Sequence, residues 1–542
     1  MAKVKYIVSL CCALCASIPT AQANDLDHKM DEHTARAMLD RFGYGADAVS
    51  LAAAMQQTPR QYLTRAIQGE THLPVSISTQ LQSLPTAQPL NDIWVQYGPG
   101  GTARANTQTD PDARKAVEKT ERDYLNAAIQ ARLLTMANSD NQGHEALLSF
   151  WLNHFSIYGE KNADKLLAGD YARALEAAMR ADSFEALLKA SFYHAAMQIY
   201  LDNAQSTSPT STAGYRQAMN GKEVGINENL AREVMELHTL GVDAGYSQKD
   251  VQELARIITG AGVYSPRMND ESLRKAGVTQ IGLFLFDPRR HDFGAKIFLG
   301  HDMPAGQGFS EVDSALHILA THPATAHHIA EKLAREFLSD HPPQALVDAM
   351  AASYLHSGGK ISATLLPLLA SPEFNASLTT PTKFKDPLHY MISAARTACS
   401  GTPIGNRFLL AATARDMGEV PFMHTTPDGY GATEADWLSP AAMAQRTRLA
   451  MAISANQAPF VSTALEPENS PANPSNPDMS TNAALPIRPK QLANRGVACQ
   501  PDLAQVAQLV GPISTTTQAA AAGLSPAEHI GLLLASPEFM QR

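Results

Sequence analysis

The stretch that decides the fold class is residues 143–155, which read GHEALLSFWLNHF. Large apolar side chains recur there at the three- and four-residue spacing of one helix face, namely Leu147, Leu148, Trp151, Leu152 and Phe155. The same period predicts helices elsewhere, over 33–39, 49–55, 60–67, about 112–136, and from 310 to about 398. We therefore expect a mostly α protein with a large helical body.

The composition agrees with this expectation. The chain has 542 residues, of which 44% are hydrophobic and only 6% aromatic, so the core is expected to consist mainly of alanine and leucine on helices. This composition excludes a disordered or collagenous chain, and the formal net charge of −10 disfavours binding to nucleic acid. The length of the chain predicts either about three domains of average size or one large helical body.

The hydrophobic period changes near residue 280. Residues 280–286 and 296–299 are predicted as two short strands, joined by a turn-forming connection over 287–294. They would form a small two-stranded β element in the helical body. Elsewhere the heptapeptide LLASPEF occurs twice, at 368–374 and 533–539. In both copies the serine is predicted to cap a new helix that begins at the proline.

The N-terminus has the pattern of a secretory signal. Lys3 and Lys5 precede an apolar run over 6–18, and the small-residue triplet 21–23 predicts cleavage after Ala23. We therefore expect an exported protein, periplasmic or extracellular. No later stretch is apolar enough to cross a bilayer, so no membrane span is expected after cleavage.

The predicted organisation has four parts. They are a signal peptide over 1–23, a helical domain over 24–461, a flexible insert with six prolines over 462–490, and a helical tail over 491–542 that packs on the main body. Beyond the signal peptide the chain has two cysteines, Cys399 and Cys499. An exported protein can oxidise such a pair, so we expect one disulfide; two separate buried thiols are the alternative.

The most informative helix is predicted over 227–241, which reads NENLAREVMELHTLG. On a helical wheel Asn229, Arg232, Glu233 and Glu236 share an arc of about 100°, separate from the apolar stripe. If that face is buried, Glu233 and Glu236 are candidates for acid–base catalysis, with Asn229 and Arg232 as candidates for substrate binding. The alternatives are a solvated, salt-bridged face, a buried structural network or a site for a hard cation.

A second candidate group follows the first predicted strand. His291 and Asp292 offer a base and an orienting carboxylate, with Lys296 nearby for substrate binding. His154 is a further candidate for substrate binding, or a hydrogen-bonded histidine at the core edge. A metal site that combines Glu233 and Glu236 with histidines also stays open, although the sequence identifies neither a metal nor a cofactor.

Several known chemistries have no matching motif in the sequence. It has no phosphate-binding P-loop, no dinucleotide-binding glycine fingerprint, no Gly-x-Ser-x-Gly nucleophile elbow, no His-Glu-x-x-His zinc motif and no haem-attachment motif.

Nine short blocks nevertheless follow one another in a recognisable order. They are 41–45 (RFGYG), 151–155 (WLNHF), 227–241, 286–296, 322–326 (HPATA), 371–374 (SPEF), 383–387 (KFKDP), 426–430 (TPDGY) and 437–440 (WLSP). In this order the chain resembles the bacterial domain-of-unknown-function 1800 (DUF1800) family along nearly all of its length after the signal. The resemblance implies an exported, mostly helical protein. It also implies a partner or a shared pathway, because DUF1800 members are commonly encoded beside an exported DUF1501 protein similar to alkaline phosphatases and sulfatases.

The sequence leaves three hypotheses for function. The first is a hydrolase or lyase that acts on an envelope or extracellular polymer through carboxylate and histidine acid–base chemistry. The second is a non-catalytic helical scaffold or partner of another exported protein. The third is a metal-binding protein.

Overall fold

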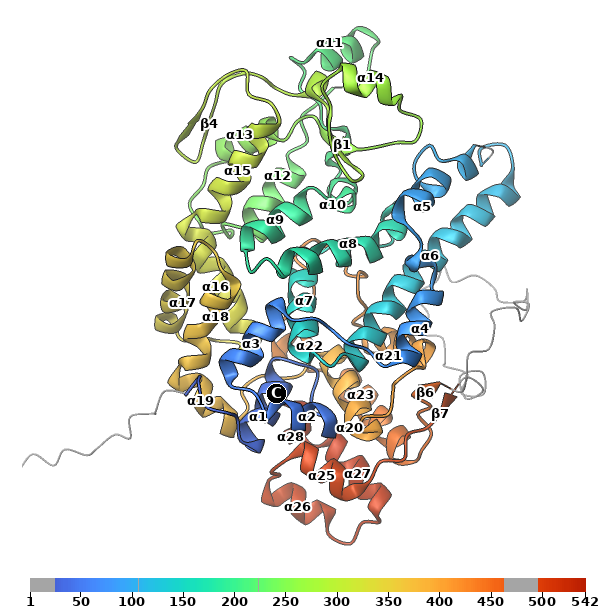
Figure 1. The fold of residues 1–542 in the computed structure, drawn as a ribbon, viewed down its shortest axis with the longest axis vertical. Helices are drawn as coiled ribbons and strands as arrows, with labels where there is room; N and C mark the ends of the chain where they lie inside the picture. The colour runs from blue at the N-terminus through green and yellow to red at the C-terminus, as the bar shows by residue number, and fades with distance from the viewer. Residues whose placement is uncertain (1–24, 106, 223, 463–495) are drawn as a thin grey trace, which may run out of the picture.

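The computed structural model describes residues 25–105, 107–222, 224–462 and 496–542. The predicted signal peptide and most of the predicted proline-rich insert lie outside these residues. The chain is mostly helical, as predicted (Figure 1). Within the described ranges, no helix is long and apolar enough to cross a membrane.

Among the residues that the structure describes, eleven α-helices precede the block at 227–241. They are α1 (Glu32–Arg41), α2 (Ala48–Ala54), α3 (Pro59–Gln68), α4 (Val75–Ser83), α5 (Leu90–Tyr97), α6 (Pro111–Asn138), α7 (Gln142–His154), α8 (Asp164–Met179), α9 (Phe184–Phe192), α10 (Ala195–Tyr200) and α11 (Thr212–Met219). The predictions for α1 to α3, α6 and α7 are confirmed to within a few residues. Their caps explain the boundaries, since Asp31, Asp47 and Thr58 each accept a first-turn backbone N–H.

The described part of the second half contains further helices and three small sheets. The helices are α12 (Asn229–Glu233), α13 (Gln248–Ile257), α14 (Asp270–Lys275), α15 (Phe309–Thr321), α16 (Pro323–Phe337), α17 (Gln344–Ser357), α18 (Ile361–Ala370), α19 (Pro372–Thr379), α20 (Pro387–Cys399), α21 (Arg407–Met417), α22 (Glu434–Trp437), α23 (Pro440–Ser454), α25 (Leu503–Val510), α26 (Thr515–Ala521), α27 (Pro526–Ala535) and α28 (Pro537–Met540). The predicted serine caps are confirmed, because Ser371 and Ser536 cap α19 and α28.

The β structure differs from the predicted pairing. Strands β1 (Ala261–Val263), β2 (Thr279–Ile281) and β3 (Phe284–Phe286) form one antiparallel sheet in the order β1-β3-β2. The strand predicted at 296–299 is β4 (Lys296–Phe298), and it pairs with β5 (His301–Met303) in a separate sheet. The reason is local: tight turns at Gly282 and Gly300, both with positive φ, give each strand a nearer partner than the one predicted. A third pair, β6 (Val461–Ser462) and β7 (Gly496–Val497), joins the main body to the C-terminal part.

One large apolar cluster runs through the described residues, from Leu26 to Met540. Within this cluster Phe42, which follows α1, stacks on Phe337 of α16 with ring centroids 4.5 Å apart. The C-terminal helices share this cluster and lie beside the N-terminal ones at one end of the molecule, whereas α11, α14 and the first two sheets lie at the other end (Figure 1). Arg36 of α1 donates to the carbonyl of Gln508 in α25, which joins the two ends of the chain.

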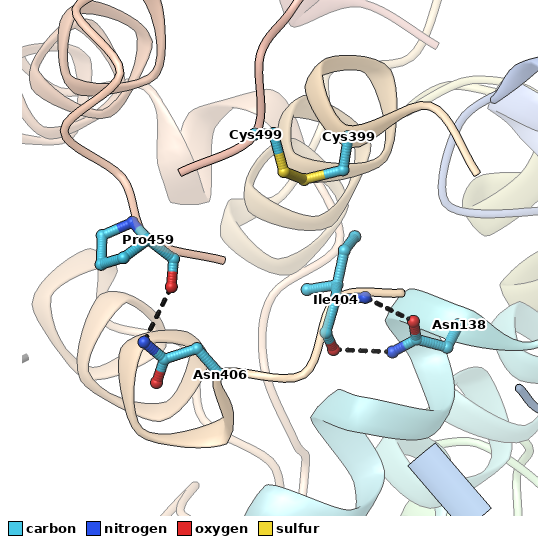
Figure 2. Close-up of a disulfide and its surroundings, with 6 residues drawn as sticks. All are labelled: Asn138, Cys399, Ile404, Asn406, Pro459 and Cys499. Carbon is cyan, nitrogen blue, oxygen red and sulfur yellow. Dashed lines mark hydrogen bonds between the residues drawn. A yellow bond between two sulfur atoms is a disulfide. The ribbon is translucent and has the colours of Figure 1, made fainter. Parts of the chain in front are cut away.

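The predicted disulfide between Cys399 and Cys499 is present in the structure (Figure 2). It joins the end of α20 to the chain just after β7. Nearby, the side-chain amide of Asn138 donates to the Ile404 carbonyl at 2.9 Å and accepts from the Ile404 N–H at 2.7 Å, which fixes the loop after the disulfide to the end of α6 (Figure 2). The C-terminal helices are therefore tied to the main body covalently as well as by packing.

Candidate functional site

The helix predicted at 227–241 is an α-helix in its first part and a π-helix in its second part. Helix α12 ends at Glu233 and continues as a π-helical segment over Val234–His238, so the wheel used for the prediction does not hold for its second half. Glu236 still accepts from Arg232 at 3.3 Å, and both side chains are half-buried. Burial and the charge of Glu236 raise the pKa of Glu233. Asn229 donates to the carbonyl of Leu201, 3.4 Å away.

The second predicted group forms a buried, paired network. The Asp292 carboxylate accepts from Arg256 at 3.1 and 3.2 Å, and it makes no hydrogen bond to the adjacent His291 ring within the described residues. The His291 ring instead lies between the Thr259 carbonyl at 2.8 Å and the Glu311 carboxylate at 3.2 Å. The predicted base and orienting carboxylate therefore do not form a dyad, because adjacent residues in this turn point to different neighbours.

Two other candidates for substrate binding are also buried. The Lys296 ammonium, 1% exposed, donates to Glu311 at 2.9 Å. The His154 ring donates to the carbonyl of His238 at 3.1 Å and packs among aromatic rings. Both therefore have the positions of structural residues, which was the alternative for His154.

A cavity of about 100 Å³, large enough for several water molecules, lies elsewhere. Its wall includes residues from five of the nine blocks quoted above, namely Tyr44, Asn153, Asp386, Tyr430 and Trp437. Blocks that are hundreds of residues apart in the sequence therefore meet at one place. Aromatic and apolar side chains form one part of the wall, among them Phe150, Leu152, Phe384, Leu388 and Phe422. Ionisable side chains form another part, namely Glu336, Asp386, His389, Glu419 and Arg542.

The guanidinium of Arg542 connects these ionisable groups. Its side chain is 1% exposed and donates to Glu336 at 2.5 Å and to Nε2 of His389 at 2.9 Å. Because Nε2 accepts, the proton of the imidazole is on Nδ1, which donates to Asp386 at 2.5 Å. Burial and the charge of Arg542 lower the pKa of His389, so the ring is neutral at neutral pH.

Asp386 and Glu419 are a carboxyl pair with opposite pKa shifts. Burial opposes ionisation of Asp386, but the His389 side chain and Arg542 outweigh it and hold the pKa of Asp386 well below its usual range. Burial and the negative charge of Asp386 raise the pKa of Glu419 well above its usual range. Glu419 therefore keeps its proton to a higher pH than Asp386 does.

Local structure explains why both carboxyls are placed here. Asp386 is the N-cap of α20, where its carboxylate accepts from the backbone N–H of His389 at 2.7 Å. Glu419 follows Gly418, whose positive φ ends α21. Its carboxyl accepts from the backbone N–H of Leu388 in the first turn of α20, 3.0 Å away.

The rest of the wall depends on a two-point contact from Asn153. The Asn153 amide accepts from the Tyr430 N–H at 2.7 Å and donates to the Tyr430 carbonyl at 2.9 Å. The preceding Gly429 has φ +77°, and a Cβ there would lie 2.4 Å from the Asn153 carbonyl oxygen. Only glycine fits, so the blocks at 151–155 and 426–430 specify one turn together.

Helix α16 carries a stripe of polar residues at four-residue spacing, His328, Lys332 and Glu336. Glu336 ends this stripe in the cavity, and burial together with Arg335 lowers the pKa of Lys332 to about 8. The spacing was visible in the sequence beside the apolar Ile329, Leu333 and Phe337 stripe, and the sequence-based interpretation missed it.

Among the described residues, one group has the composition and spacing of a metal site. Ligand atoms of Glu336, Asp386 and His389 lie within 4.8 Å of one another. Arg542 already bonds to two of these three side chains, so an ion would compete with the guanidinium for its partners.

A search of curated proteins and a search of solved structures gave no match. The family model described as "Protein of unknown function (DUF1800)" matches residues 37–541. That range includes every block and every residue of the cavity except Arg542. The chain therefore belongs to the DUF1800 family.

Proposed function

We propose that this protein is an exported hydrolase or lyase that acts on an envelope or extracellular polymer, with its acid–base chemistry in the cavity at Glu419 and Asp386. The observation that carries the proposal is that two carboxyls, Asp386 and Glu419, line one cavity, where their surroundings shift their pKa values in opposite directions. Environments that push two carboxyl pKa values apart supply an acid and an ionised partner at the same pH.

Each group has a definite role in hydrolysis. Glu419 donates its proton to the leaving atom of the substrate as the bond to that atom breaks. Asp386 stays ionised and stabilises the positive charge that develops on the substrate. A water molecule then adds to the substrate and returns a proton to Glu419. Arg542 and His389 position Asp386 and keep it ionised.

The proposal places the acid–base chemistry in the cavity and not at Glu233 and Glu236, the candidates from the sequence. Both side chains are half-buried, and Glu236 is ion-paired with Arg232. The signal-like N-terminus and the disulfide support export. The DUF1501 partner remains an expectation from the family.

The proposal is tested with the mature protein on purified peptidoglycan and on extracellular polysaccharides. Soluble products are measured by mass spectrometry. We expect Glu419→Gln to abolish release, while Glu233→Gln, a matched change outside the cavity, leaves it intact. Because Glu419 acts as an acid, release should also fall as the pH rises through its raised pKa. Equal release by wild type and Glu419→Gln would contradict the proposal.

Metal binding is the second candidate, and the Glu336, Asp386 and His389 group is the observation in its favour. On this hypothesis Zn²⁺ or Mn²⁺ binds after it displaces Arg542. Calorimetric titration with each ion tests it: Arg542→Met should tighten binding and His389→Ala should abolish it. Absence of binding to both the wild type and Arg542→Met excludes this candidate.

A further inference from the structure

Two aromatic rings on the cavity wall are held rigidly. The rings of Tyr430 and Trp437 lie 6.0 Å apart at an angle of 39°. The indole N–H of Trp437 donates to the Gly431 carbonyl at 2.9 Å. The Tyr430 hydroxyl donates to the Val420 carbonyl at 3.0 Å and accepts from the Val420 N–H at 3.1 Å. Since the polar atoms of both rings are bonded within the protein, a ligand meets their apolar faces.

Trp437 differs in exposure from the other two tryptophans. Trp94 and Trp151 are both 0% exposed, in keeping with a role in the core. Trp437 is only partly buried and lines the cavity. A large aromatic ring that is held in place at a cavity wall and left partly open is typical of a binding surface.

The ionisable part of the wall accepts and donates hydrogen bonds but adds little charge. Glu336 and Asp386 are ionised, since their partners outweigh burial and lower both pKa values. Arg542 offsets one of the two negative charges, while burial opposes the ionised forms of both Glu419 and His389. The negative charge that remains disfavours an anionic ligand, and the room for several waters suits a ligand rich in hydroxyl groups.

We propose that the polymer is a neutral polysaccharide, with one sugar ring stacked on Trp437 and its glycosidic oxygen at Glu419. A sugar ring has C–H groups on its faces and hydroxyls at its rim, which matches an aromatic wall beside carboxyls. This proposal rests on the proposed function and names its substrate class.

The reaction follows from the two carboxyls. Glu419 protonates the glycosidic oxygen, and the bond from that oxygen to the anomeric carbon breaks with its electron pair going to the oxygen. The Asp386 carboxylate stabilises the positive charge on the anomeric carbon. Water adds to that carbon and loses a proton, which restores Glu419 to its neutral form. One glycosidic bond and one water molecule give two sugar ends, with no oxidant or reductant.

The test measures tryptophan fluorescence. Trp437 is the partly exposed tryptophan in the cavity wall, whereas Trp94 and Trp151 are buried. The Glu419→Gln protein, which cannot turn over substrate, is titrated with neutral oligosaccharides of glucose, xylose, mannose and N-acetylglucosamine, and with oligogalacturonate as the anionic comparison. We expect at least one neutral series to change the emission and to bind at least about tenfold more tightly than oligogalacturonate.

Two variants in the same background assign the signal to stacking. Trp437→Ala should weaken binding, measured by calorimetry, by about tenfold or more, while Trp437→Phe keeps a ring face and should stay within about threefold. Circular dichroism establishes that both fold. Equal binding by the alanine and phenylalanine variants would overturn the proposal, as would absence of binding by every neutral series or tighter binding of the anionic one.

The result separates this proposal from the proposed function. Glu419-dependent cleavage of a peptide or anionic polymer, without binding of neutral oligosaccharides, would overturn the polysaccharide assignment and keep the acid–base function. Binding of neutral oligosaccharides through Trp437, with cleavage that is independent of Glu419, would keep the ligand class and overturn the catalytic assignment.

Discussion

Replacing Arg542 by methionine should destabilise the protein far more than the loss of an ordinary surface arginine. The Arg542 side chain is 1% exposed, and its guanidinium bonds to Glu336, to His389 and, at 3.3 Å, to the carbonyl of Arg41. Methionine keeps much of the volume but leaves two ionised carboxyls without their cation. Removing one partner of a buried charge pair costs about 3–5 kcal/mol, so we expect a loss of that size in the free energy of unfolding.

The matched control is Arg60→Met. Arg60 also pairs with a carboxylate, Asp27 at 2.8 Å, but its side chain is 45% exposed, and such surface pairs contribute about 0–1 kcal/mol. Urea unfolding at pH 7 measures both variants. A loss for Arg542→Met that equals the loss for Arg60→Met would refute the account of the buried network.

The pH dependence gives the same prediction a second check. The pKa values of Glu336 and Asp386 are held below their usual range, so these groups stabilise the fold above the unfolded-state pKa of about 4. That contribution is lost as the pH falls through the lower folded-state values. The difference in the free energy of unfolding between wild type and Arg542→Met should therefore be largest at pH 7 and become smaller in acid. A difference that increases in acid would contradict the assigned charges.

Three further predictions concern other parts of the structure. Replacing Cys399 and Cys499 by serine opens a covalent loop with a sequence separation of 100 and should cost up to about 4–5 kcal/mol, measured by unfolding against the oxidised wild type. Gly429→Ala should cost about 1–3 kcal/mol and increase acrylamide quenching of Trp437, because a Cβ collides with Asn153; unchanged stability would argue against the two-point contact. Glu419→Gln should lose less stability than wild type as the pH rises from the unfolded-state pKa of about 4 through the raised folded-state pKa of Glu419, because over that range the unfolded chain ionises while the folded carboxyl stays protonated; parallel profiles over that range would argue against the shift.

Local patterns in the sequence predicted the local structure well. The apolar period located α1, α2, α3, α6 and α7, and the Ser-Pro pairs located the starts of α19 and α28. The disulfide followed from there being two cysteines after the predicted signal peptide. These features depend on neighbouring residues or on a single pair, which a sequence displays directly.

Features that depend on distant contacts were harder to predict. The π-helical segment at 234–238 departs from the regular helical period that the prediction assumed. The cavity brings Glu336, Asp386, Glu419 and Arg542 together from four separate segments. Asp386 stood within a quoted block, 383–387, but the pairing that shifts its pKa exists only in the fold.

The central claim is that Glu419 is a neutral acid beside an ionised Asp386, and infrared spectroscopy measures this most directly. A protonated carboxyl absorbs at a higher frequency than a carboxylate. We expect the wild-type minus Glu419→Gln difference spectrum at pH 7 to show one protonated carboxyl band. Asp164→Asn is the matched control, because burial also raises the pKa of Asp164 outside the cavity. A Glu419→Gln difference spectrum without that band, or with a carboxylate band in its place, would contradict the account.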